Sequence, residues 1–535
     1  MKLSTLMPAA LLLMIFIGCN ERIHKSGEAA ADLKADNLIM KNSLPAPPAA
    51  VRNEELEKEK SFNTEGYAHI VENKFQGTFQ NPLSTFSIDV DEASYSNIRR
   101  HIQSGSLPPA GAVRIEEMIN YFDYEYPKPG NDAPFSVVTE IAECPWNNQH
   151  RLVHIGLQGR EIQIQHLPAA NIVFLIDVSG SMDESNKLPL VKASLDLLVG
   201  QLRENDKVAV VVYAGNAGLV LPSTNGMNKS RIKEAIDNLD AGGSTAGGEG
   251  IQLAYKIARE NFITNGNNRV VLATDGDFNV GVSSDDELVR LIEKERQSGV
   301  FLSVLGFGVG NYQDNKMQQL ADKGNGNHSY IDNINEARKV LVSEFGSTLF
   351  TIAKDVKLQI EFNPLKVQAH RLIGYENRVL AAEDFNDDKK DAGEIGSGHT
   401  VTALYEIIPV GVKTEFIGTI DSSKYQANSK KISGSPDEIM TIKLRYKTPE
   451  EDNSKLISKS VMDENKILAA TSDNFRFSAA VASFGMVLRN SAYKQQSSNQ
   501  LVLSLAKTSR GADNNGYRQE FIKLVEAVAT LAKAK

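Results

Sequence analysis

Short apolar runs alternate with amphipathic segments between residues 172 and 348, and this alternation constrains the fold more than any other feature. Continuous apolar runs are typical of strands buried on both faces, and strands that alternate with helices form parallel sheets covered by helices. We therefore predict an α/β fold with a doubly wound, mostly parallel sheet. The expected strands are residues 172–177, 207–213, 269–274, 300–306 and 328–331, with a short antiparallel edge strand between 218 and 222.

Amphipathic segments supply the helices that cover this sheet. Two of them have a polar residue suited to a helix start, because Ser230 can cap a helix and Ser284 with Glu287 has the spacing of a capping box. The expected helices are residues 188–202, 230–239, 248–262, 286–297, 315–322 and 336–348.

Strand-like segments lie on both sides of this α/β unit. Residues 86–159 combine strand alternation with helical segments at 94–103 and 115–122, and strand patterns return at 356–362, 400–408 and 438–446. We hypothesise that these strand-rich segments pair into one β-sandwich with the α/β unit inserted. Residues 475–488 and 519–532 have a helical period and predict C-terminal helices.

The length of 535 residues exceeds what a single hydrophobic core supports, so we expect several parts. The composition is 41% hydrophobic, as in soluble globular proteins, and the formal charge of −9 argues against a nucleic-acid partner. The predicted parts are a signal peptide (1–18), a disordered tether (19–62), an N-terminal α+β flank (63–165), the α/β unit (166–349), a C-terminal β-rich region (350–465) and a C-terminal helical region (466–535).

The N-terminus has the features of an export signal. Lys2 precedes an apolar segment, residues 7–17, which is too short to span a bilayer and is followed by Gly18 and Cys19. This arrangement resembles the lipobox of bacterial lipoproteins, which implies that Cys19 is lipidated and that the protein is anchored in the cell envelope, either periplasmic or surface-exposed. The alternative is an ordinary signal peptide with an incidental cysteine.

The remaining cysteine, Cys144, is expected to be a small buried apolar residue, because a lipidated Cys19 leaves no intramolecular disulfide. Between Cys19 and the fold, residues 20–62 are rich in Ala, Glu, Lys and Pro and poor in aromatics. This composition is typical of a disordered tether.

Three loops at predicted strand ends carry oxygen-bearing side chains. The first holds Asp177, Ser179 and Ser181, the second holds Thr245 before a helix, and the third holds Asp275. In an open parallel sheet, ligands bind outside the C-terminal ends of the strands. Because carboxylates and hydroxyls are hard oxygen ligands, the three loops predict a divalent cation site, with Mg²⁺ as the first choice and Ca²⁺ or Mn²⁺ as alternatives.

These residues resemble the metal-ion-dependent adhesion site (MIDAS) of von Willebrand factor type A (VWA) domains, whose pattern is Asp-x-Ser-x-Ser, then Thr, then Asp. The resemblance covers residues 169–348, and the whole chain is similar to a bacterial lipoprotein subgroup of that family. It implies that Ser179 and Ser181 bind the metal directly, while Thr245 and Asp275 exchange direct and water-mediated contact as the last helix moves.

The resemblance also implies the kind of partner. In the family, a Glu or Asp of the bound protein completes the metal coordination, so we expect a protein ligand that presents a carboxylate. A structural envelope scaffold with a stabilising metal is an alternative, and a metal-dependent hydrolase is another.

Enzyme chemistry has little support in the sequence. A nucleophilic Asp177 of the haloacid dehalogenase type needs a carboxylate two residues later, and the chain has Ser179 there. The glycine-rich loop at Gly242 lacks a following Gly-Lys-Ser/Thr, which argues against nucleotide binding. His150 and His154 alternate as in a strand, where they are too far apart to chelate a metal comfortably. We therefore expect a binding protein without catalytic residues.

Overall fold

The computed structural model describes residues 63–130, 133–163, 166–244, 247–276, 285–344, 350–418, 435–449 and 451–532. All of them belong to one compact unit, Ser61–Lys535. Within these ranges, no helix is both long and apolar enough to cross a membrane. Three predictions lie outside the described residues: the lipidation site Cys19, the tether and the helix cap at Ser284.

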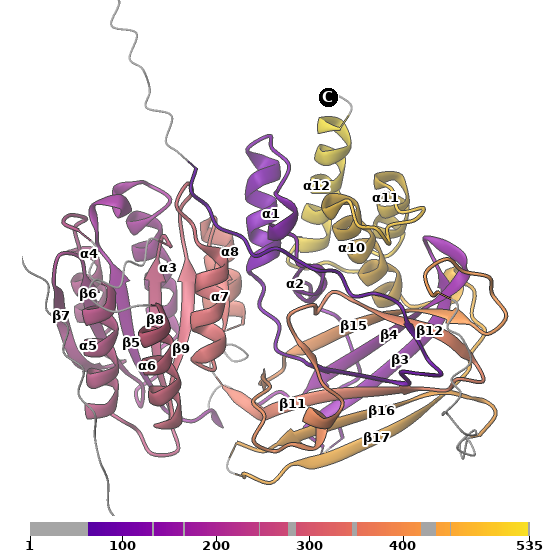
Figure 1. Cartoon of the computed structure of the whole chain (residues 1–535). Coiled ribbons are helices and arrows are strands. Elements are labelled where there is room, and N and C mark those ends of the chain that lie inside the picture. Colours follow the sequence, from indigo (N-terminus) through magenta and orange to yellow (C-terminus); the bar gives the residue numbers. More distant parts are fainter. Residues whose placement is uncertain are drawn as a thin grey trace, which may run out of the picture. The chain divides into compact units, whose positions relative to one another are not determined.

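The α/β unit is built on a six-stranded sheet with the order β10-β9-β8-β5-β6-β7 (Figure 1). Every neighbouring pair is parallel except β6 and β7, as predicted from the apolar runs. The strands are β5 (Ala170–Asp177), β6 (Lys207–Tyr213), β7 (Ala217–Asn225), β8 (Asn267–Thr274), β9 (Val300–Gly306) and β10 (His328–Tyr330).

Helices cover both faces of this sheet, because each face of its central strands is apolar. On one side pack α3 (Leu188–Gln201), α4 (Lys229–Asp237) and α8 (Ile334–Arg338), and α8 continues into the π-helical turn η4 (Lys339–Ser343). On the other side pack α5 (Gly247–Glu260), α6 (Asp285–Gln297) and α7 (Asp314–Lys323). The doubly wound prediction is confirmed.

The predicted cap at Ser230 is wrong. Helix α4 begins one residue earlier, at Lys229, and Asn228 occupies the N-cap position without a side-chain hydrogen bond to the helix. Ser230 is exposed in the first turn. The last predicted helix, 336–348, begins at Ile334 and continues through the π-helical turn to Ser343, and residues 345–348 of the prediction lie outside the described residues.

The strand-rich segments on either side of the α/β unit form one β-sandwich. Strand β2 (Leu83–Ser87) pairs with β11 (Thr351–Phe362), and β4 (Asn147–Gly159) pairs with β15 (Thr400–Pro409), all antiparallel. Each sheet therefore contains strands from before and after the α/β unit, which confirms the insertion hypothesis. The other strands are β1 (Gln76–Gly77), β3 (Phe135–Cys144), β12 (Val367–Ile373), β13 (Val379–Leu380), β14 (Gly393–Gly396), β16 (Glu438–Lys447) and β17 (Lys455–Met462).

The two sheets have the orders β1-β12-β15-β4-β3 and β13-β2-β11-β16-β17, and β14 pairs with β11. Their facing sides share a core that includes Phe86, Val153, Leu358 and Tyr405. Two antiparallel sheets that pack face to face around a shared core form a β-sandwich.

Helices cover the outer side of the β1-β12-β15-β4-β3 sheet (Figure 1). They share a second core with Leu152 and Leu404 of the sheet, and Cys144 is buried in this core as predicted. The helices are α1 (Ala93–Gln103), α2 (Ile115–Asn120), α10 (Asp473–Arg489), α11 (Asn499–Thr508) and α12 (Tyr517–Leu531), with short 3₁₀ turns η1 (Ala110–Ala112), η5 (Glu383–Asn386) and η6 (Leu468–Ala470).

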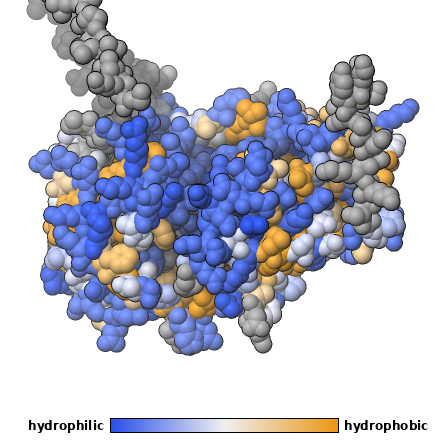
Figure 2. Space-filling view, turned by 60° about the horizontal axis from the view of Figure 1, so that its bottom comes forward, coloured by the Kyte–Doolittle hydropathy of each residue, from blue (hydrophilic) through white to orange (hydrophobic). Residues whose placement is uncertain are grey.

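Hydrophilic residues cover most of the face seen in Figure 2, and hydrophobic residues form small separate patches on it. Exposed large apolar side chains such as Phe79 and Leu365 lie on turns of the sandwich. Scattered apolar residues of this kind are normal on a protein surface.

Candidate functional site

Strand β5 places Asp177 at the edge of the sheet. The seven residues before it are all buried, so the strand is fixed by apolar packing and its last residue is delivered to a defined position. Asp177 is itself fully buried. Its Oδ1 accepts a hydrogen bond from the Ser179 backbone N–H (2.9 Å), and its Oδ2 accepts from the hydroxyls of Tyr213 (3.0 Å) and Thr274 (3.3 Å).

The two serines of the same loop face each other. The Oγ atoms of Ser179 and Ser181 lie 3.1 Å apart. Adjacent ligands of an octahedral Mg²⁺ ion with bonds of about 2.0–2.1 Å are separated by about 2.9 Å. The spacing of the hydroxyls therefore fits two neighbouring positions of a magnesium coordination sphere.

Asp275 follows β8 and is also fully buried. Its Oδ2 accepts hydrogen bonds from Lys187 Nζ (3.1 Å) and from Asn311 Nδ2 (2.9 Å). Thr274, the residue before Asp275, donates to Asp177, and Lys187 contacts both the Ser181 carbonyl and Asp275. The structure thus brings together Asp177, Ser179, Ser181 and Asp275.

Thr245 lies outside the described residues. The preceding part of its loop contacts the serine loop through backbone hydrogen bonds, from Gly242 N–H to Val178 O (2.8 Å) and from Gly180 N–H to Gly243 O (3.1 Å). Residues 242–243 of this loop therefore border the site.

Lys187 is a site residue that the sequence reasoning missed. Its buried side chain donates to the Ser181 carbonyl (2.9 Å) as well as to Asp275. Gly308 makes room for it, because a Cβ atom there would come within 2.5 Å of Lys187 Cε. The only signal in the sequence is a lysine directly before an apolar helix, which ordinarily indicates a solvated charge.

Burial dominates the electrostatics of Asp177. Desolvation raises the pKa of this carboxyl to about 6, the negative charge of Asp275 acts in the same direction, and hydrogen bonds from Ser179 and Tyr213 oppose both. An ionised Asp177 is therefore costly until a cation compensates it.

No three carboxylate, imidazole or thiol groups within the described ranges lie close enough to hold a metal ion. A cation held by Asp177 and Asp275 would need hydroxyl oxygens to complete its ligand set, and the nearby hydroxyls are those of Ser179 and Ser181. The histidines of β4 take no part, since His150 contacts Glu406 (2.5 Å) and His154 contacts the Tyr126 hydroxyl (3.0 Å) in the sandwich.

Family comparisons match three consecutive parts of the chain. The model of the von Willebrand factor type A domain matches residues 171–342. A model described as von Willebrand factor matches residues 61–154, and one described as "Uncharacterized protein YfbK, C-terminal" matches residues 347–531. Together with the fold, these matches define the protein as a VWA-domain protein, a class that generally serves protein–protein interaction or adhesion and is mostly non-enzymatic.

A relative covers nearly the whole molecule. The Escherichia coli (strain K12) protein described as "Uncharacterized protein YfbK" is 45% identical over 471 residues, which make up 86% of this chain and 81% of that protein. The chain belongs to the YfbK family of VWA-domain proteins.

Two further proteins are similar at lower sequence identity. The Synechocystis sp. protein described as "Uncharacterized protein sll0103" is 29% identical over 170 residues, or 31% of this chain and 39% of that protein. A solved structure titled "von Willebrand factor type A from Catenulispora acidiphila" is 14% identical and covers 85% of this chain and 91% of its own, with a TM-score of 0.40.

Proposed function

We propose that this protein is anchored in the bacterial cell envelope and binds a protein partner through a divalent cation, with Mg²⁺ as the natural ion. Its ligands would be Asp177, Ser179, Ser181, Thr245 and Asp275, and an Asp or Glu of the partner would complete the coordination. The observation that carries the proposal is the meeting of two buried carboxylates with two hydroxyls 3.1 Å apart at the strand ends.

The charges of the site favour an anionic partner. Asp177 and Asp275 contribute −2 and Lys187 contributes +1, so the group carries −1 without a cation and +1 with Mg²⁺. Hydroxyl ligands add no charge of their own. A carboxylate from the partner would neutralise the loaded site in a buried environment, where Coulomb attraction is stronger than in water.

The anchor in this proposal is a lipid on Cys19. Supporting it are the short apolar segment before this cysteine and the Pro- and Glu-rich residues 20–62 after it. Several acyl chains would make the attachment stable, whereas one chain would be marginal. The protein would face either the periplasm or the cell exterior.

The test is capture of envelope proteins by cross-linking, with and without a chelator. We expect Asp177→Ala and Thr245→Ala to abolish cation-dependent capture while the far-ultraviolet circular dichroism stays unchanged. Asp183→Ala is the matched control, because Asp183 is an exposed carboxylate in the same loop. Unchanged capture by either site variant would contradict the proposal.

A structural scaffold is the second candidate function. It differs in one measurement, because a metal that only stabilises the domain raises its melting temperature without affecting partner binding. If chelation lowers the melting temperature but capture is equal with and without Mg²⁺, the scaffold replaces the adhesion proposal. The metal-dependent hydrolase is weaker, since the site has a serine where a second catalytic carboxylate would stand.

A further inference from the structure

One loop links the candidate site to the part of the chain that precedes the VWA domain. Residues 307–313 follow β9, and Gly308 and Gly310 have positive φ angles (74° and 92°) that turn the loop back toward Asp275. Asn311 lies at this turn and its side-chain Nδ2 donates to Asp275 Oδ2 (2.9 Å). The loop thus supplies one of the groups that orient the carboxylate.

Asn311 has a second polar atom that the fold leaves unused. Its Oδ1 is buried, and no described residue donates a hydrogen bond to it. A buried acceptor without a partner costs free energy, so such atoms usually bind water or a ligand. Next to Asp275, water on a bound cation is a suitable donor.

The N-terminal segment 64–67 holds this loop from outside the VWA domain. Thr64 N–H donates to Gly310 O (2.7 Å) and Gly66 N–H donates to Tyr312 O (2.9 Å). Gly66 and Gln313 form a parallel β-bridge. The backbone of residues 64–66 is therefore paired with the loop on either side of Asn311.

Glu65 ties the loop to helix α1. Its carboxylate accepts from the Gly310 backbone N–H (2.9 Å), from both terminal nitrogens of Arg100 (2.7 and 3.0 Å) and from the Tyr67 hydroxyl (2.9 Å). The side chain is 4% exposed. Burial alone would raise the pKa of Glu65, but these hydrogen bonds lower it to about 2, so the group is charged at neutral pH.

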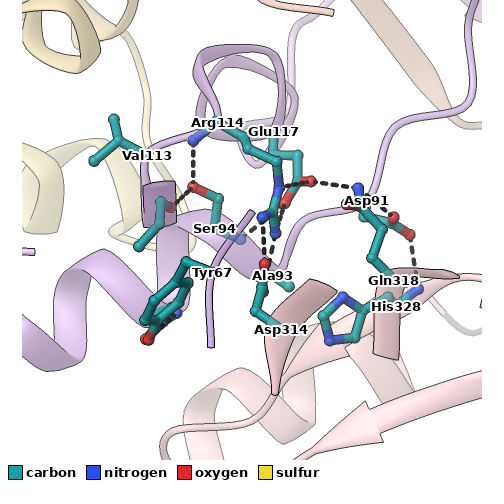
Figure 3. A network of polar contacts seen from close by, with 12 residues as sticks. Tyr67, Asp91, Ala93, Ser94, Val113, Arg114, Glu117, Asp314, Gln318 and His328 are labelled. Carbon is teal, nitrogen blue, oxygen red and sulfur yellow. Dashed lines mark hydrogen bonds and ion pairs between the residues drawn. The ribbon is translucent and has the colours of Figure 1, made fainter. Parts of the chain in front are cut away.

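The far end of the loop is held by a second buried contact, shown in Figure 3. Asp314, the first residue of α7, forms an ion pair with Arg114, which also pairs with Glu117 of α2. At the near end, the Tyr330 hydroxyl donates to Gly308 O (2.6 Å). The loop therefore has three attachments: to segment 64–67, to Arg114 and to Tyr330. The first two come from residues before the VWA domain.

We propose that Asn311 is an outer-sphere residue of the cation site and that Glu65 positions it from the N-terminal flank. Asn311 orients Asp275 through Nδ2 and accepts a hydrogen bond from cation-bound water through Oδ1. The inference rests on the proposed function, because it assigns residues to the same site. It means that the VWA domain depends on residues 64–67 for full cation affinity.

The test is titration of Mg²⁺ by calorimetry into the full chain and its variants. Outer-shell partners of metal ligands contribute about 10- to 100-fold to affinity. We expect Asn311→Ala and Glu65→Gln each to weaken Mg²⁺ binding by about tenfold. Because Glu65 acts through Asn311, the double variant should be no weaker than the weaker single variant.

A matched control is Glu376→Gln, which removes a partly buried carboxylate paired with Arg489 of α10 (2.5 Å) and should bind Mg²⁺ like the wild type. Asn311 is half-buried, so its variant decides the test even if Glu65→Gln folds poorly. Wild-type affinity in Asn311→Ala, or losses that multiply in the double variant, would overturn the inference alone. A wild type that binds no Mg²⁺ would overturn the proposed function and the inference with it.

Discussion

At the scale of single residues, the site is organised by buried charges of opposite sign. Asp177 and Asp275 are fully buried, and Lys187 places an ammonium 3.1 Å from Asp275. This ammonium repels a cation that enters the site, and it attracts an anionic partner. Lys187 would therefore weaken cation binding and strengthen partner binding.

This double role predicts that Lys187→Met changes the affinity for Mg²⁺ and the affinity for the partner in opposite directions. We expect Mg²⁺ to bind about tenfold more tightly, because a repulsive charge is removed at similar side-chain volume. Cation-dependent capture of an acidic partner should weaken. Calorimetry with Mg²⁺ and the cross-linking assay measure the two effects, and a variant in which both affinities fall would contradict the assigned role.

At the scale of elements, the sequence predicted the VWA sheet well and the helix starts less well. The central strands β5, β6 and β8 contain continuous apolar runs, which their short length and β-branched residues distinguish from a helix. The residue type of Ser230 predicts a cap, but the helix begins one residue earlier, and Asn228 at the N-cap position forms no side-chain hydrogen bond with it. No helix is predicted from the sequence at α11, although Ser498 caps this helix by accepting a hydrogen bond from the Leu501 backbone N–H.

The residues of the candidate site also fall into two groups, those that the sequence predicts and those that only the fold brings to the site. Asp177, Ser179, Ser181, Thr245 and Asp275 follow from the motif, and the first three with Asp275 lie together. Lys187 and Asn311 could not be predicted, because their roles depend on loops that approach one another only in the fold. Glu65 could not be predicted either, because it lies about 210 residues along the chain from Asp275.

Helix α2 contains a carboxylate that makes folding depend on pH. Glu116 is buried, and its Oε2 accepts no hydrogen bond from the described residues. Desolvation, with the nearby charges of Glu376 and Glu117, raises the pKa of Glu116 to about 7. A raised pKa means that the folded state holds the proton longer than the unfolded chain, so stability is lost as pH rises from about 4.5 through 7.

Glu116→Gln should therefore stabilise the protein only at higher pH. We expect no gain at pH 5 and a gain on the order of 1–3 kcal/mol in the free energy of unfolding at pH 8, because glutamine stays neutral. Urea unfolding at both pH values measures it. Glu361→Gln is the control, since that carboxylate is half exposed, and it should show no such difference. An equal effect of Glu116→Gln at both pH values would argue against the shifted pKa.

At the scale of the whole molecule, the chain leaves the sandwich for the VWA domain and then returns to complete both sheets. Strand β2 needs β11 and strand β4 needs β15. The VWA sheet, in contrast, consists of strands that are consecutive in the chain. The flanks are therefore one folding unit, although the VWA domain separates them in sequence.

Truncation tests this arrangement. A chain that ends at residue 348 should lose protection of its N-terminal flank, because β2 and β4 are left with unpaired edges and exposed apolar faces. Limited proteolysis with mass analysis of the fragments measures this. Fragments from the complete VWA sheet serve as the internal control and should stay resistant. A flank that remains fully resistant would contradict the shared sandwich.

In our proposal, the strand-end loops bind a divalent cation. Calorimetric titration of Mg²⁺ into the wild-type protein and into Asp177→Ala tests it most directly. We predict saturable binding at one site in the wild type and none in the variant. Absence of binding in the wild type, or equal binding in Asp177→Ala, would contradict the claim.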